Sequence, residues 1–94
     1  MATPPNLNEI WDYQNPAETE KKFMQILADS EGFSEEYVLI LQTQIARTYS
    51  LQRKFSEAHE LLDLVHNGLI GSNLGLVEAN YFLERGRTFN SNNE

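Results

Sequence analysis

Residues 39–66 read LILQTQIARTYSLQRKFSEAHELLDLVH, and this stretch decides the fold. Apolar side chains recur at spacings of three and four over 38–49, which is the pattern of one helix face. After the short turn Arg53-Lys54 the pattern resumes over 55–69. The stretch therefore predicts two amphipathic helices joined by a tight turn. Their apolar positions are Val38, Leu41, Ile45 and Tyr49, then Phe55, Ala58, Leu61, Leu62, Val65 and Leu69.

The flanking sequence also carries helix signals. Asn15 can cap a helix that begins at Pro16. Proline suits the first helical position because it lacks the N–H that would be unpaired there. Ser34, followed by two glutamates, marks the next start, since carboxylates favour the positive end of a helix. No sustained alternation or hairpin turn predicts a strand. We therefore expect an all-α chain of about four main helices, with residues 1–15 as an N-terminal segment or short capping helix and 91–94 as a frayed tail.

Composition restricts the function. The chain has 94 residues, no cysteine, and seven Lys or Arg against 14 Asp or Glu, for a net charge of −7. This length predicts a single domain over 1–94, and the missing cysteines exclude thiol chemistry, disulfides and Cys-ligated zinc. The negative charge argues against nucleic acid and anionic membranes as partners. With neither an apolar run that could span a bilayer nor a signal-peptide pattern at its start, the chain is expected to be cytoplasmic.

An ordered set of small and aromatic residues lies within 39–66. Ala46 precedes an aromatic residue, a tight turn follows, and Ala58 then precedes two large apolar residues. This order resembles the tetratricopeptide repeat, in which small residues let two antiparallel helices approach closely. Arg53 stands where that family often has glycine, Gln42 stands where it often has an aromatic residue, and its terminal proline is absent.

A second, partial copy follows at an offset of 40 residues, longer than the usual repeat and similar to elongated variants of the family. It places Phe82, Gly86, Arg87 and Phe89 under Gln42, Ala46, Arg47 and Tyr49. The resemblance covers residues 16–90 and implies antiparallel helix-turn-helix repeats stacked as a short right-handed α-solenoid. Small residues at 46, 58 and 86 are then expected where neighbouring helices press together. The alternative is a generic helical hairpin bundle.

The resemblance implies a non-catalytic module that binds a peptide or a protein segment in a concave groove. Arg47 and Arg87 occupy equivalent repeat positions, from which two guanidiniums could each grip a partner's carboxylate. The alternative is that both arginines pair with neighbouring glutamates or stay solvated. The candidate partner-binding residues are Thr43, Arg47, Ser50, Asn80, Leu83, Arg87 and Asn90.

Metal binding and catalysis find little support. His59, Asp63 and His66 share helical spacing, but seven residues of helix separate the two histidines by about 10.5 Å, too far for one ion. No nucleophile or phosphate-binding motif is present in the sequence. We therefore expect no cofactor and no enzymatic activity. An all-α enzyme or metal-binding fragment is the less favoured alternative, and an acidic decoy that occupies a partner's basic surface is another.

The last predicted helix leaves an apolar side uncovered, because Phe82, Leu83 and Phe89 have no following helix to pack against. Repeat proteins need covered ends to be stable. A homodimer formed through this exposed terminal helix is therefore expected. The alternative is a fragment of a larger regulatory or scaffold protein of the same repeat type, whose ends mainly mediate self-association.

Overall fold

The computed structural model describes residues 4–69 and 81–87, and within these residues every regular element is a helix and no strand occurs. Helix α1 spans Leu7–Ile10, α2 spans Pro16–Ala28, α3 spans Glu35–Leu51 and α4 spans Phe55–Leu69. Residues 81–87 are also helical. The all-α prediction is therefore confirmed for the described part of the chain. The predicted contributions of Asn80, Phe89 and Asn90 lie outside the described residues.

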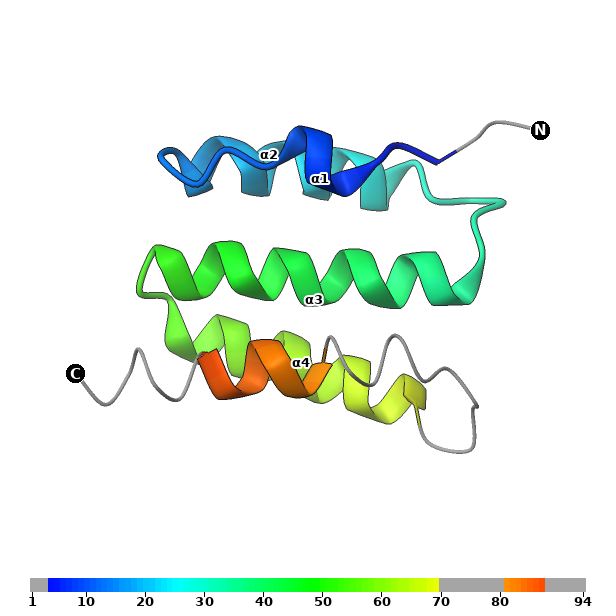
Figure 1. Cartoon of the computed structure of the whole chain (residues 1–94). Coiled ribbons are helices and arrows are strands. Elements are labelled where there is room, and N and C mark those ends of the chain that lie inside the picture. Colours follow the sequence, from blue (N-terminus) through cyan, green and yellow to red (C-terminus); the bar gives the residue numbers. More distant parts are fainter. Residues whose placement is uncertain (1–3, 70–80, 88–94) are drawn as a thin grey trace.

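The long helices follow one another as antiparallel neighbours, with α3 between α2 and α4 (Figure 1). Helix α1 lies against α2, and residues 81–87 lie against α4 (Figure 1). Both short segments are on the same side of the three long helices, with α3 between them. This arrangement leaves one flank of α3 bordered by two separate segments of the chain.

The predicted helix starts are confirmed by their caps. The Asn15 side chain accepts a hydrogen bond from the Glu18 N–H, and Pro16 is the first residue of α2. Ser34 Oγ accepts from the Tyr37 N–H at 3.1 Å, which places the start of α3 at Glu35. Each cap satisfies one of the N–H groups that a helix start leaves unpaired.

The turn between α3 and α4 contains a left-handed residue. Arg53 has a φ of 62°. Glycine takes this conformation without a Cβ penalty, whereas arginine does so at a cost. The turn therefore carries a conformational cost that a glycine at position 53 would avoid.

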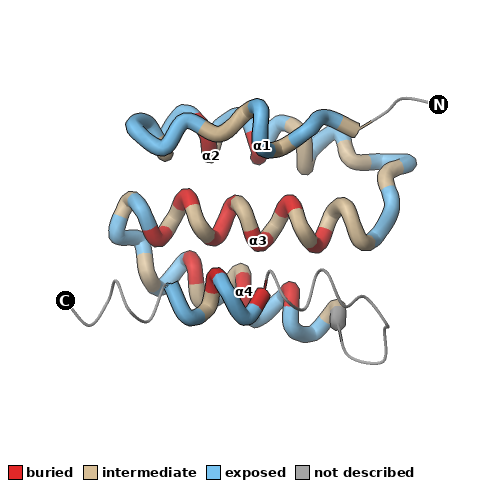
Figure 2. Tube along the Cα trace, in the orientation of Figure 1, coloured by how far each residue is buried: buried red, intermediate tan, exposed pale blue. Residues whose placement is uncertain are grey.

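Helix α3 has two buried faces and so forms the centre of the core (Figure 2). Leu41 and Ile45 pack with Phe23 of α2, while the face of Leu39 and Ala46 packs with α4 and with Tyr81. Burial of one large apolar side chain is worth about 1.5–3 kcal/mol. The stability of the domain therefore depends on both faces of a single helix.

The small residues at 46 and 58 are fully buried, as predicted, but the prediction for Gly86 is wrong. Gly86 is exposed, and a Cβ added there would meet no described atom within 4 Å. The close approach of helices occurs instead at Gly68, where an added Cβ would lie 3.0 Å from a methyl group of Leu39. Gly68 thus lets the end of α4 approach the first half of α3.

Candidate functional site

A cavity of about 430 Å³ opens on the flank of α3 between the N-terminal segment and residues 81–87. Helix α3 lines it with Tyr37, Ile40, Gln44 and Arg47. The helical residues 81–87 add Leu83, Glu84 and Arg87. Residues 5–8 and Tyr13 form the opposite side. We call this cavity the groove.

A buried carboxylate joins the two arginines of the groove. Glu84 is only 2% exposed, and its Oε2 accepts a hydrogen bond from Arg87 Nη1 at 3.0 Å. Its Oε1 lies 3.5 Å from Arg47 Nη1. Burial raises the pKa of the Glu84 carboxyl above its ordinary value, and the attraction of Arg87 and Arg47 offsets part of that shift. The pairing of both arginines with a neighbouring glutamate was the alternative interpretation of the sequence.

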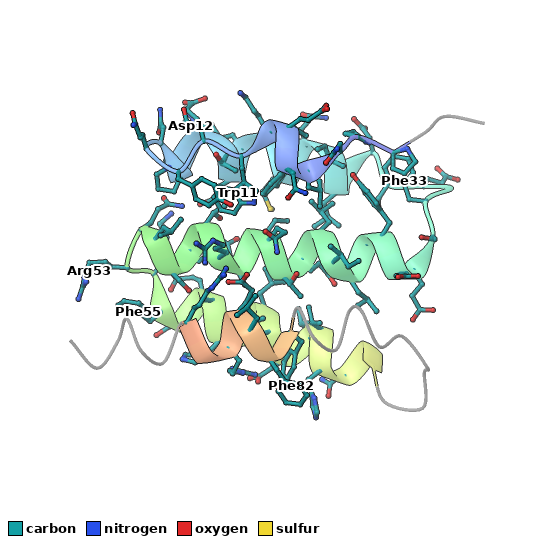
Figure 3. All side chains as sticks on the ribbon, in the orientation of Figure 1. Trp11, Asp12, Phe33, Arg53, Phe55 and Phe82 are labelled. Atoms are coloured by element: carbon teal, nitrogen blue, oxygen red, sulfur yellow. The ribbon has the colours of Figure 1, made fainter. Side chains whose placement is uncertain are left out.

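Aromatic rings also contact Arg47. Its guanidinium carbon lies 5.4 Å from the ring centre of Tyr13 and 5.9 Å from that of Trp11. The two rings are stacked on each other, 4.6 Å apart and nearly parallel. Trp11 Nε1–H donates to Gln44 Oε1 at 2.9 Å, which fixes the ring beside α3 (Figure 3). A cation–π contact and an ion pair therefore both restrain Arg47.

The structure brings together three of the predicted site residues and separates two others from them. Arg47, Leu83 and Arg87 all line the groove. Thr43 and Ser50 do not line it, because they are buried and their hydroxyls donate to the carbonyls of Ile40 and Ala46 in their own helix. On α3 both are turned about 40–60° away from Arg47, toward the face that packs on α4.

Sequence reasoning missed four residues of this site. Glu84 lies three positions before Arg87 on a helix, and this spacing alone indicates an ion pair. Its contact with Arg47 has no such local signal, because it depends on how the last described helix lies against α3. The same holds for Trp11 and Tyr13, which reach Arg47 from a distant part of the chain, and for Gln44, which accepts from Trp11.

A second polar cluster joins residues 81–87 to α4. Arg85 Nη1 donates to His59 Nδ1 at 2.7 Å, and Arg85 Nη2 pairs with Asp63. The Arg85 guanidinium therefore bonds to both His59 and Asp63, two of the three side chains considered as metal ligands. His66 instead stacks on the ring of Tyr81. No group of three candidate metal ligands occurs within 4–69 and 81–87.

This cluster predicts a pH-dependent stability. Burial and the nearby Arg85 lower the pKa of His59 below its ordinary value of about 6.5. A base whose pKa is lowered by folding gives the folded state its full stabilisation at pH values above the ordinary pKa. That stabilisation is lost as the pH falls through the lowered pKa. Protonation would also turn Nδ1 into a donor and end its bond with Arg85.

We expect the wild-type chain to lose more stability than a His59→Gln variant when the pH falls from about 7.5 to about 5. Glutamine can still accept from Arg85 but does not titrate. Urea unfolding at each pH measures the difference, and every other titrating group is common to both chains. Parallel stability curves for the two chains would contradict this role of His59.

Comparison with known proteins gives no assignment, since no protein-family model, curated protein or solved structure matches the chain. Among the helices in the described part of the chain, none combines the length and the apolar character needed to cross a membrane. The function is therefore inferred from the residues and the shape of the groove.

Proposed function

We propose that this chain is a non-catalytic protein–protein interaction module that binds a peptide or a protein segment in the groove. The carrying observation is the cavity of about 430 Å³, which both apolar and cationic side chains line. Ile40 and Leu83 offer apolar surface, and Arg87 offers a guanidinium whose side chain is 42% exposed. A concave site with apolar walls and few polar anchors is the common form of a ligand site.

The order of the helices supports a tetratricopeptide-like solenoid as the architecture of this module. In such a stack, the first helix of a pair contacts both helices of the preceding pair. Residues 81–87 have this relation to α3 and α4, because Glu84 pairs with Arg47 and Arg85 pairs with Asp63. We propose that the groove is the concave face of a short right-handed stack of this kind.

Self-association through residues 81–87 is the second candidate function. Phe82 is 61% exposed and Leu83 is 50% exposed, so this helix presents two large apolar side chains to solvent. Exposed apolar surface of this kind can cover itself by pairing with a second copy. A homodimer would then use the rim of the groove as its interface.

Photo-crosslinking at two matched positions tests the proposal. A benzoylphenylalanine replaces either Leu83, on the groove, or Leu64, which is 60% exposed on α4 beside a smaller cavity that Glu57 and Glu60 line. Irradiation in cell extract is expected to give defined adducts with other proteins from position 83 and none from position 64. Adducts of twice the chain's own mass from position 83 would favour self-association instead. Equal labelling from both positions, or adducts from position 64 alone, would overturn the proposed site.

A further inference from the structure

We propose that the groove selects a segment with one carboxylate next to an apolar side chain, and that Glu84 sets this number by engaging both arginines from within the protein. The inference depends on the proposed function and specifies its ligand. It also revises the expectation from sequence that each of the two arginines grips a carboxylate of the partner.

The charges of the groove favour an anionic ligand of low charge. The whole chain carries a net charge of −7, whereas the described lining of the groove holds two guanidiniums and one carboxylate. One positive charge therefore remains in a cavity within an acidic protein. A single carboxylate would neutralise it, and a second would be repelled by the net negative charge of the chain.

Arg87 is the more accessible of the two arginines. Arg47 has a side-chain exposure of 21% and is held between the rings of Trp11 and Tyr13 and the carboxylate of Glu84. Arg87 is twice as exposed, at 42%, and donates to Glu84 through Nη1. A guanidinium carries five N–H donors in a planar fork, so donors remain for an incoming carboxylate.

Two apolar side chains of the groove favour an apolar neighbour for that carboxylate. Leu83 and Ile40 line the cavity from two different helices, and Leu83 is half exposed. The Tyr37 hydroxyl already donates to the Pro5 carbonyl at 2.7 Å, which joins the N-terminal segment to α3 and uses the only donor of this side chain. A leucine, isoleucine or phenylalanine beside the ligand carboxylate would cover Ile40 and Leu83.

A bead-bound positional-scanning library of hexapeptides tests the inference, with acetylated and amidated ends so that only side chains carry charge. Labelled wild-type protein is expected to enrich peptides with one Asp or Glu beside a large apolar residue. Arg87→Gln should lower their binding about tenfold or more, because a hydrogen bond to a charged group is lost. Arg53→Gln removes the same charge from the α3–α4 turn, away from the groove, and should change nothing.

The variant Glu84→Gln tests the role of Glu84 in setting the number of carboxylates, separately from the ligand class. It frees both guanidiniums from an anionic partner, so its enriched peptides should carry two acidic residues. An unchanged preference in a folded Glu84→Gln protein would overturn the role of Glu84. If this variant does not fold, the Arg87→Gln and Arg53→Gln pair still decides the ligand class.

The results that would overturn the ligand class differ from those that would overturn the groove as a binding site. Enrichment of peptides without an acidic residue, or equal losses from Arg87→Gln and Arg53→Gln, would overturn the ligand class and leave the groove as a binding site. Enrichment of no peptide at all would also overturn the ligand class. In that case, crosslinking from position 83 independently decides whether the groove binds a protein.

Discussion

Replacing Phe23 with alanine is expected to lower the free energy of unfolding by about 3–5 kcal/mol. A domain of this size has a total stability of about 5–15 kcal/mol, so the variant should be largely unfolded in moderate urea. Phe23 is fully buried and packs against Leu41 and Ile45 of α3. Its ring also meets the edge of Trp11 at 5.4 Å between centroids. The substitution thus removes contacts with α3 and with the N-terminal segment at once.

Met24→Ala is the matched control for this prediction. Met24 is the next residue of α2 and is 42% exposed, so its truncation should change stability by no more than about 0.5 kcal/mol. Urea unfolding followed by far-ultraviolet circular dichroism measures both variants. Emission from Trp11, the single tryptophan, reports on the same cluster. Equal losses from Phe23→Ala and Met24→Ala would show that α2 does not pack as described.

Helix positions in this protein could be predicted from sequence because their signals are local. The caps at Asn15 and Ser34 act within a few residues, and the apolar periodicity of 38–49 marks a helix without reference to its neighbours. The burial of Ala46 and Ala58 could also be predicted, since small residues within an apolar stripe indicate close packing. These features accounted for α2, α3 and α4.

The site could be predicted only in part because it depends on the rotation of one helix against another. The repeat alignment placed Thr43 and Gly86 in the groove and in the packing seam, respectively, yet Thr43 is buried in α3 and Gly86 is exposed. The close contact of Gly68 with Leu39 joins two helices and leaves no pattern within either one. Arg47 and Arg87 both line the cavity called the groove here, but the carboxylate between them was not foreseen.

Replacing Arg47 with methionine is expected to lower stability by about 3 kcal/mol, since it leaves the buried Glu84 with one guanidinium in place of two. Methionine preserves much of the side-chain length, so the loss reports on charge more than on volume. It also ends the contacts with Trp11 and Tyr13. Urea unfolding gives the value. An effect below about 0.5 kcal/mol, as at an exposed position, would contradict the described environment of Arg47.

We infer that Glu84 and Arg47 hold residues 81–87 against α3 and so create the groove. A double-mutant cycle over Arg47→Met and Glu84→Gln tests it most directly, because effects of Arg47 on the aromatic rings cancel in the coupling term. The double variant is expected to be more stable than the sum of the single losses predicts, by at least about 1 kcal/mol. Losses that add to within about 0.5 kcal/mol would mean that the two side chains do not interact, and that the groove does not form as described.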